Sequence, residues 1–460
     1  MGTGALMRHW RALPRNAPPK TDNAKTHILK PNTRDVSRFW LQYFDFLFYR
    51  IQTMFFLFWI LVLYGTTIIA LTAATLRGKR GRQVAAPTEF PGVSVIIPFR
   101  NEKHNLHALL ESLAGQSYKG EIEIILVNDQ SEDDGVAVIE TFRENSGRIN
   151  TKIINLQLCS DTHLTSKQQA LDLGVSQSSY PLLAFTDADM ILAPNWIESL
   201  VDTQAATGAA LVFGHTSIMK SDAGQTRKSA LFAKFESYQL EFLFSFAYAF
   251  SKLGFTGSCM GNNILVTKES YNECGGQRGI GYSIVEDRAL LEILRRKKYK
   301  TAAAEPFHTT ASTYPSRTKT QFANQAMRWA AGGLRPGGGL FLAGLLFAVQ
   351  NVVLLLSAIG VISALLALLL PSGDIIWLLT AILSPILIPI AAIIIANFLL
   401  TWLFLAITFI KNKSRASKLF YPVYYVFMML EMAVLGVLFV FKRGKVRWKD
   451  RELRHRRANN

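Results

Sequence analysis

Two blocks of apolar sequence constrain this chain most, because each is long enough to cross a lipid bilayer. The first is MFFLFWILVLYGTTIIALTAATL (54–76), about the 20 residues that a spanning helix needs. The second block, residues 340–441, contains three apolar runs, and the prolines at 385 and 389 allow the middle run to form one span or two. We therefore expect a transmembrane helix at 51–76 and a transmembrane region with three or four spans at 340–441.

The positive charge of the chain flanks these apolar blocks. The formal net charge is +17, and more than all of it lies in residues 1–50, 77–82, 411–418 and 442–460. Basic residues beside apolar spans are typical of membrane proteins, whereas a nucleic-acid-binding protein more often carries its charge on the folded domain. We expect a basic N-terminal segment, a basic tail and membrane lipid as a partner, and no nucleic acid.

Several kinds of site are excluded by pattern. The three cysteines, Cys159, Cys259 and Cys274, include no C-x-x-C pair, which argues against a disulfide framework or a zinc site and suits a reducing compartment. The sequence contains neither G-x-x-x-x-G-K-[ST] nor G-x-G-x-x-G. The phosphate-binding loops of ATPases and dinucleotide-binding folds are therefore missing.

Residues 77–339 have the rhythm of an α/β domain. VSVIIP (93–98) and IEIILV (122–127) are short β-branched runs that predict buried strands. Between them, four leucines fall on one face of a predicted helix: Leu106, Leu109, Leu110 and Leu113. Strands that alternate with helices indicate parallel pairing, with ligands bound at the carboxyl ends of the strands.

Two acids follow the apolar strand LLAFT (182–186). In extended backbone, residues two apart face the same side, so Asp187 and Asp189 would point their carboxylates at one spot. Hard oxygen ligands in that arrangement suit Mg²⁺ or Mn²⁺ bound together with substrate phosphates. A solvated turn is the alternative interpretation of so short a pattern.

Five stretches of the sequence occur in a fixed order: VSVIIPFRNE (93–102), IEIILVNDQSEDDG (122–135), FTDADM (185–190), VEDRALLEIL (285–294) and QAMRW (325–329). Together they resemble the membrane-bound family-two glycosyltransferases, which have the GT-A fold. The resemblance implies an α/β, GT-A-type nucleotide-diphospho-sugar transferase domain, cytoplasmic and flanked by transmembrane helices.

The resemblance also implies a donor site. Six residues would bind the nucleotide-sugar: Pro98, Arg100, Glu102, Asp129, Lys167 and Asp187. Asp129 would hold the base or the ribose, although Asn128 stands where many members have a first acid. An ordinary surface lysine at a helix start is the alternative for Lys167.

Metal binding and catalysis would fall to the acidic pairs. Asp189, with Asp187, would hold Mn²⁺ or Mg²⁺ against the donor diphosphate, whose negative charge grows as the sugar leaves. Glu286 and Asp287 match the acidic pair of the family at the start of a helix, with Asp287 as the general base. Two acids that only stabilise a helix dipole are the alternative.

The acceptor side is implied by two further segments. Gln325 and Arg328 share a helix face in Q-x-x-R-W, so that Arg328 would meet the diphosphate and Trp329 would stack on the acceptor. Residues 256–277 resemble the acceptor-side loop and strand, in which Cys259 is a packing residue. GGQRGIGY (275–282) has the composition of a mobile loop.

The resulting hypothesis is an inverting hexosyltransferase that moves a sugar from a UDP- or GDP-sugar to a lipid or glycan acceptor. It would be an integral protein of the bacterial inner membrane. A processive polysaccharide synthase is the alternative within the same class. A catalytically silent scaffold that binds a nucleotide-sugar is the alternative from another class.

Overall fold

In the computed structural model, the sheet domain is described at residues 90–146, 150–159, 163–219, 227–306, 308–316, 318, 320–325 and 327. Outside the sheet domain, the structure describes residues 52, 55, 58–59, 61–76, 392–393, 395–410, 418–428, 445–448 and 451–454. Its strands are β1 (Val93–Phe99), β2 (Ile122–Asn128), β3 (Asn150–Asn155), β4 (Leu182–Phe185), β5 (Met190–Leu192), β6 (Leu211–Phe213), β7 (Thr216–Ile218), β8 (Ile264–Thr267), β9 (Thr301–Ala303), β10 (Ala311–Thr313), β11 (Lys445–Trp448) and β12 (Arg451–Arg454). Its named helices are α2 (Lys103–Ala114), α3 (Gly135–Ser146), α4 (Ser166–Ser176), α5 (Trp196–Thr207), α6 (Arg227–Lys252), α7 (Lys268–Glu273), α8 (Gly276–Ile280), α9 (Glu286–Arg296) and the short 3₁₀ helix η2 (Lys418–Phe420). The α/β class expected from the sequence is confirmed.

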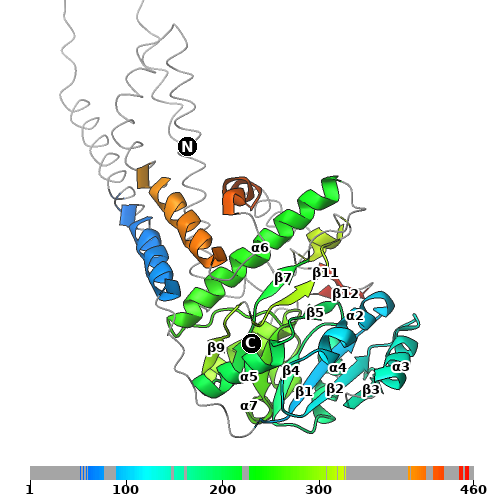
Figure 1. The fold of residues 1–460 in the computed structure, drawn as a ribbon. Helices are drawn as coiled ribbons and strands as arrows, with labels where there is room; N and C mark the ends of the chain where they lie inside the picture. Colours follow the sequence, from blue (N-terminus) through cyan, green and yellow to red (C-terminus); the bar gives the residue numbers. More distant parts are fainter. Residues whose placement is uncertain are drawn as a thin grey trace, which may run out of the picture. The chain divides into compact units, whose positions relative to one another are not determined.

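Within the described residues, the main sheet has seven strands in the order β3-β2-β1-β4-β8-β6-β9, of which Figure 1 labels β1 to β4 and β9. Strands β3, β2, β1 and β4 pair in parallel, and β8 runs antiparallel to both of its neighbours. A smaller sheet has the order β5-β10-β7. The parallel half of the main sheet is the part that the α/β rhythm predicted.

The apolar patterning explains the first elements. Residues 93–97 of β1 and 123–127 of β2 are buried, as expected for strands covered by helices on both faces. On α2, the buried residues are the four leucines of the predicted face: Leu106, Leu109, Leu110 and Leu113. These side chains pack with β1 and β2 in one apolar core, and a second core on the other face of the sheet includes residues from α4, α6 and α9.

The antiparallel strand β8 brings distant segments together. In the β4–β8 pair, Phe185 at the end of β4 lies opposite Ile264 at the start of β8. The residues just after β4 therefore lie at the same edge of the sheet as the residues just before β8. Asp187 belongs to the first of these segments and Gly261 to the second.

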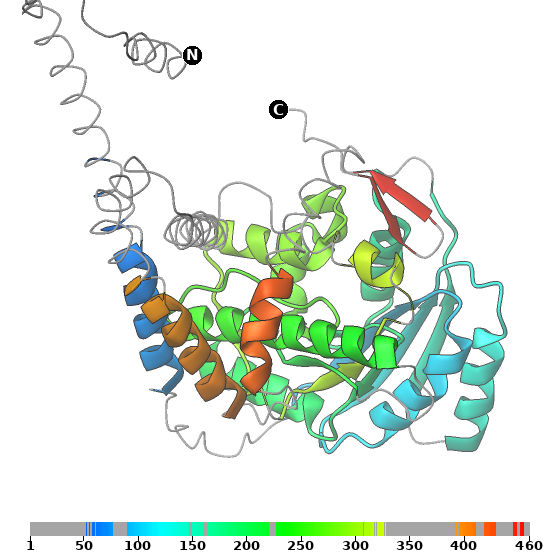
Figure 2. The same ribbon diagram turned by 90° about the horizontal axis from the view of Figure 1, so that it is seen from above.

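Helix α6 has two buried faces. Phe244, Ala247 and Tyr248 belong to the core of the sheet domain, where α6 packs against β7 and β9. The other face belongs to a largely aromatic cluster formed with residues 61–76, 398–410 and 420–428: Tyr64, Ile68, Leu71, Phe235, Tyr238, Phe242, Ala249, Phe404, Leu405, Phe409, Tyr421, Tyr424, Tyr425 and Met428. This helix thus connects the sheet domain to segments from both apolar blocks (Figure 2).

The helix at 61–76 lies against the helix at 395–410 (Figures 1 and 2). Asn397 Nδ2 donates to the carbonyl oxygen of Leu61 at 2.9 Å, and the hydroxyls of Tyr64 and Thr401 are 2.9 Å apart. A Cβ atom on Gly65 would lie 2.6 Å from Asn397 Oδ1, so the glycine leaves room for the Asn397 side chain. The two predicted membrane segments therefore pack through polar contacts and a small residue.

None of the helices that the structure describes combines the length and the apolar character that a membrane crossing requires. Most of the expected region at 340–441 lies outside the described residues, as do residues 1–50 and much of the basic tail at 442–460.

Candidate active site

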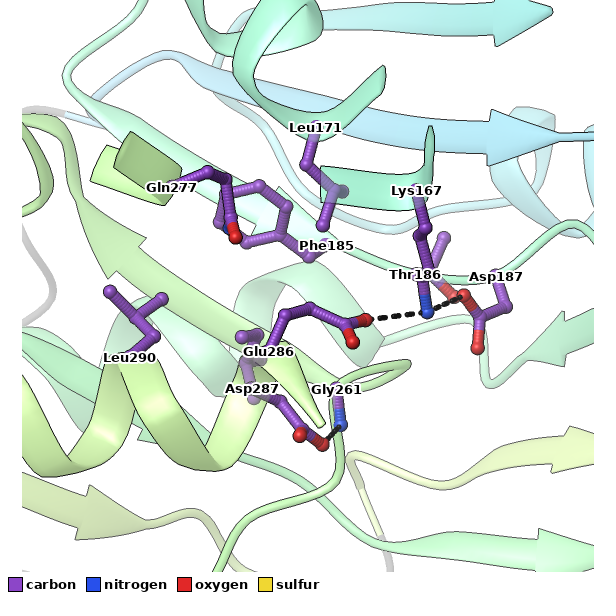
Figure 3. Close-up of a pocket in the computed structure, with 11 residues that line it drawn as sticks. Lys167, Leu171, Phe185, Thr186, Asp187, Gly261, Gln277, Glu286, Asp287 and Leu290 are labelled. Carbon is purple, nitrogen blue, oxygen red and sulfur yellow. Dashed lines mark hydrogen bonds and ion pairs between the residues drawn. The ribbon is translucent and has the colours of Figure 1, made fainter. Parts of the chain in front are cut away.

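A pocket lies at the carboxyl end of β4, where α4, α8, α9 and the chain before β8 meet (Figure 3). Its lining combines an apolar floor with one lysine and three acids: Lys167, Leu171, Phe185, Thr186, Asp187, Gly261, Ile264, Gln277, Glu286, Asp287 and Leu290. The carboxyl end of a parallel strand is where α/β folds bind their ligands. Four of the predicted site residues, Lys167, Asp187, Glu286 and Asp287, are brought together here.

Lys167 lies between two acids from different elements. Its Nζ is 2.9 Å from Asp187 Oδ1 and 2.8 Å from Glu286 Oε1 (Figure 3). Burial acts to lower the pKa of Lys167, but the charges of Asp187 and Glu286 outweigh it and raise that pKa above its ordinary value. The lysine therefore stays charged and is not the ordinary surface lysine that the sequence left open.

The start of α4 fixes the position of Lys167. Thr165 and Gln168 form a capping box, in which the Thr165 hydroxyl accepts from the Gln168 amide. The buried side chain of Gln168 also donates to the carbonyl of Gly281 at 2.8 Å and accepts from the amide of Ser283 at 3.1 Å. The helix that carries Lys167 is thus tied to the segment that leads to Glu286.

Residues 275–282 differ from the mobile loop expected from their composition. Residues 276–280 form the short helix α8, and the side chain of Gln277 is buried. The glycines have a local purpose at its two ends, where Gly275 and Gly281 adopt positive φ angles of 76° and 69°. The segment is a folded part of the pocket wall because Gln168 and Gln277 supply polar contacts that composition does not reveal.

Asp287 is held by the backbone. Its Oδ2 accepts from the amide of Gly261 at 2.6 Å, and its Oδ1 accepts from the amide of Arg288 at 2.7 Å. Burial, and then the charge of Glu286, raise the pKa of Asp287 to about 6, against the opposing effects of the two amides and Lys167. A carboxyl with a pKa near 6 is suited to accept a proton near neutral pH.

Gly261 has no room for a side chain. A Cβ atom there would lie 2.8 Å from the Cβ of Asp287 and 2.9 Å from its Oδ2. Its backbone can therefore donate to Asp287 only because residue 261 is a glycine. Sequence reasoning did not single out this residue, although the small residues of TGSCMGNN were a signal for close backbone approach.

Asp187 and Asp189 do not lie in the continuous extended strand that the sequence analysis assumed. Strand β4 ends at Phe185, and a turn at residues 188–189 precedes β5. Asp187 Oδ1 forms an ion pair with Lys167, whereas Asp189 Oδ2 accepts a hydrogen bond from the Thr313 hydroxyl of β10 at 3.3 Å. The turn gives the two acids different neighbours at one edge of the sheet.

The described residues contain no group of three or more His, Cys, Asp or Glu side chains placed to hold a metal ion. Two carboxylates nonetheless fit Mg²⁺ or Mn²⁺, because such ions commonly take one or two protein carboxylates and complete their shell with substrate phosphate and water. Asp187 and Asp189 are hard oxygen donors, and the Asp187 side chain is 33% exposed.

The other residues predicted to bind the donor lie at the ends of the neighbouring strands β1 and β2. Arg100 Nη1 donates to the carbonyl oxygens of Asp129 and Gln130 at 3.0 and 2.9 Å, and Nη2 pairs with Glu132 at 3.1 Å. The amide of Asp129 donates to the carbonyl of Phe99 at 2.8 Å. Arg100 therefore shapes the turn that presents Asp129.

Other side chains in this region organise the fold locally. Glu102 Oε2 accepts from Asn105 at 2.6 Å, and Pro98 belongs to β1. Asn128 donates to Asn155 at 2.9 Å and accepts from the amide of Ser131 at 2.8 Å. The side-chain amide of Asn128 thus connects β2 to β3 and closes the turn after β2.

The predicted acceptor residues are described only in part. Gln325 lies in the helical residues 320–325, whose start is capped by reciprocal hydrogen bonds between Thr318 and Gln321. Arg328 and Trp329 lie outside the described residues.

Cys259 is a buried packing residue, as expected. Its thiol donates to the carbonyl oxygen of Asp287 at 3.6 Å. Burial, followed by the charges of Asp287 and Glu286, raises its pKa well above the ordinary value. The thiolate form is therefore disfavoured, which argues against a nucleophilic role.

Residues 94–275 match the model described as glycosyl transferase family 2. The matched range includes β1 to β8, Lys167, Asp187, Asp189 and Gly261.

Two curated relatives illustrate the sequence similarity. A glycosyltransferase of Haloferax volcanii, AglE, is 31% identical over 135 residues, which cover 29% of this chain and 42% of the relative. A ceramide glucosyltransferase of Caenorhabditis elegans, number 3, is 23% identical over 274 residues, covering 58% of this chain and 55% of the relative. The chain thus spans about half the length of the curated relatives it matches.

Among solved structures, the mannosyltransferase PcManGT of Pyrobaculum calidifontis, in complex with GDP-Man and Mn²⁺, is similar with a TM-score of 0.44 and 16% identity. The match covers 78% of this chain and 99% of the mannosyltransferase chain.

Proposed function

The chain belongs to glycosyl transferase family 2, with a GT-A-like α/β fold, and we propose that it is an inverting hexosyltransferase acting at a membrane. It would transfer a sugar from a UDP- or GDP-sugar to a lipid acceptor. One observation carries this proposal. Lys167, Asp187, Glu286 and Asp287 meet in a single pocket at the carboxyl end of β4, although they come from three segments of the chain.

Asp287 has the position and the proton affinity of a general base. In the proposed reaction, the acceptor hydroxyl oxygen forms a bond to the anomeric carbon while the bond from that carbon to the diphosphate oxygen breaks. The hydroxyl proton goes to Asp287, and the bonding electron pair leaves with the nucleoside diphosphate. Attack from the side opposite the leaving group inverts the anomeric centre.

The two amide hydrogen bonds orient the Asp287 carboxylate before the acceptor arrives. Because the Gly261 and Arg288 amides are part of the backbone, they hold both oxygens without side-chain reorganisation. Glu286 raises the proton affinity of Asp287 by its charge and also keeps Lys167 in place. Lys167 in turn lies beside Asp187, at the side of the pocket where the donor diphosphate would bind.

A divalent cation, Mn²⁺ or Mg²⁺, would be held by Asp189 and Asp187 and would neutralise charge on the departing diphosphate. Thr313 orients Asp189 for that role by its hydrogen bond to Oδ2. Pro98, Arg100, Glu102 and Asp129 would bind the nucleotide at the ends of β1 and β2.

A lipid acceptor is favoured by the length of one sequence match. The ceramide glucosyltransferase aligns with more than half of this chain, a range longer than the family domain itself. The two apolar blocks also favour action at a membrane. The protein would be integral to a bacterial inner membrane, with residues 77–339 on the cytoplasmic side. Gln325, Arg328 and Trp329, close before the second block, would then meet the acceptor near the membrane surface.

The test is release of nucleoside diphosphate by the purified full-length protein in lipid nanodiscs. A panel of UDP- and GDP-sugars would be offered with Mn²⁺, with Mg²⁺ or with a chelator, and with a bacterial lipid extract as acceptor. We expect turnover of one donor only, which depends on the metal and on the extract. The product would be a lipid with a single added sugar.

The matched variant is Asp287→Asn, which keeps the shape of the side chain but removes the base. We expect turnover to fall by about 100- to 10,000-fold while donor binding is kept, since general-base catalysis contributes roughly that much. Products with long sugar chains would indicate a processive synthase instead. Donor binding without any release would indicate a silent scaffold.

A further inference from the structure

Glu236 is a buried acid that the proposed reaction does not use. It lies on α6, and only 2% of its surface is exposed. Burial raises its pKa, against the opposing effect of hydrogen bonds from Ser316. A carboxyl buried to this extent requires partners, because an unpaired one would be costly.

Both oxygens of Glu236 are occupied by one residue. Oε2 accepts from the backbone amide of Ser316 at 2.8 Å, and Oε1 accepts from the Ser316 hydroxyl at 2.8 Å. The two bonds fix the backbone and the side chain of Ser316 together. These hydrogen bonds hold Ser316 against α6, although Ser316 and Glu236 are 80 residues apart in the sequence.

Ser316 passes this constraint to the predicted acceptor segment. Its Oγ lies 3.2 Å from the side-chain amide of Gln325. A hydroxyl has only one proton, so when that proton goes to Glu236 the Gln325 amide turns its NH₂ group toward Oγ and donates. The result is a chain of hydrogen bonds from Gln325 through Ser316 to Glu236.

The same helix holds the segment from a second side. Phe235, the neighbour of Glu236, stacks on Phe427 with ring centroids 3.9 Å apart. Phe322, three residues before Gln325, lies 6.1 Å from Phe427 and 5.9 Å from Phe232 of α6. Polar and aromatic contacts therefore join one stretch of α6 to the start of the Q-x-x-R-W segment.

We propose that Glu236 is a positioning residue for acceptor binding, which sets the place of Gln325. This proposal rests on the proposed function, because it takes the Q-x-x-R-W segment to bind the acceptor. Glu236 does not itself touch the substrate. It acts through Ser316, three residues beyond the strand residue Thr313 that holds Asp189.

The chemistry of the pair predicts which substitutions keep the link. In Glu236→Gln, Oε1 accepts from the Ser316 amide and Nε2 donates to the Ser316 hydroxyl, which is then free to donate to Gln325. The chain of bonds survives with its direction reversed. In Glu236→Leu the side chain still fills the space, but the amide and hydroxyl of Ser316 lose their partner.

Two measurements on the full-length protein in nanodiscs test the proposal. The first is steady-state kinetics. It gives the KM for a bacterial lipid extract, the kcat at saturating extract, and the rate of the slow release of nucleoside diphosphate without extract. The second is hydrogen–deuterium exchange of peptides covering residues 316–327. Tyr248→Phe is the control, because it removes a 2.9 Å contact between the same helix and Glu305, away from Ser316.

For Glu236→Leu we expect the KM for the extract to rise about tenfold, as loss of a buried hydrogen-bonded link predicts. Release without extract should stay within about twofold of wild type. Exchange should become faster at residues 316–327 and stay unchanged in β1 and β4, which also shows that the variant is folded. Glu236→Gln and Tyr248→Phe should behave as wild type in both measurements.

Unchanged exchange in Glu236→Leu would overturn the positioning role. Faster exchange with an unchanged KM would overturn the link to the acceptor. If the wild type releases nothing from any donor, the proposed function is wrong, and the exchange measurement still decides whether Glu236 holds the segment.

Discussion

The acidity of a single carboxyl, Asp287, should be visible in the pH dependence of turnover. A base must be ionised, and the pKa of Asp287 is raised to about 6, mainly by burial. We therefore expect kcat to fall about tenfold for each pH unit below about 6 and to level off above it. A pH–rate profile at saturating donor and acceptor measures this limb.

Lys167→Met supplies the control for that assignment. The positive charge of Lys167 lowers the pKa of Asp287, so its removal should move the acid limb to higher pH as well as reduce turnover. A limb that stays in place in this variant would mean that another group titrates.

The glycine beside the proposed base leads to a second prediction. Gly261→Ala would place a Cβ 2.8 Å from the Cβ of Asp287 and force the carboxylate to move. We expect kcat to fall about 100-fold with little change in donor affinity, because a small displacement of a catalytic group has effects of that order. Steady-state kinetics and donor titration would separate the two.

Gly115→Ala is the matched control, since a Cβ there would meet its nearest neighbour at 3.5 Å, an ordinary contact. Equal loss of activity in both alanine variants would remove the special role of Gly261.

At the scale of single residues, the sequence predicted the acids of the site but not the residues that surround them. Asp187, Glu286 and Asp287 belong to short patterns whose order along the chain suggests their chemistry. Gly261 and Glu236 belong to no such pattern. Their importance arises from contacts with residues 26 and 80 positions away, and the sequence does not state these contacts.

Among the elements, α4 connects Lys167 in the pocket to the segment that leads to the proposed base. Gln168→Leu would leave the amide of Ser283 and the carbonyl of Gly281 without their partner in a buried region. We expect the free energy of unfolding to fall by about 2–6 kcal/mol, since each of the two buried groups left unsatisfied costs roughly 1–3 kcal/mol. Denaturant unfolding of the purified protein measures this loss.

Gln169→Leu is the control for Gln168→Leu, because the neighbouring side chain bonds to Cys159 in a more exposed position. A similar loss of stability in both variants would show that the contacts to residues 281 and 283 contribute little.

Elements with a strong local pattern could be predicted, and those defined by pairing could not. The β-branched runs predicted β1 and β2, and the spacing of four leucines predicted α2. The antiparallel direction of β8 has no such signal, because ILVT is equally apolar in either direction. The turn at residues 188–189 was missed for the same reason, since it follows from how β5 pairs with β10.

For the whole molecule, the apolar blocks and the basic stretches lead to a prediction about fractionation. We expect the protein to sediment with membranes, to resist washing with high salt and alkaline carbonate, and to dissolve only with detergent. Apolar spans are insensitive to salt, whereas attraction of basic segments to anionic lipid is screened by it. Immunoblots of the fractions measure the distribution. Release by salt alone would indicate peripheral binding and contradict the proposal of an integral membrane protein.

The short segment from Thr313 to Ser316 has a thermodynamic consequence. Thr313 holds Asp189 and Ser316 contacts Gln325, so a donor that draws Asp189 inward also acts on the acceptor side. Coupling of two binding sites is reciprocal, and each substrate should then increase the affinity for the other by the same factor. Calorimetric titration of the donor with and without saturating lipid acceptor, using Asp287→Asn to prevent turnover, measures that factor. A factor of one would show that the two ends of the segment respond independently.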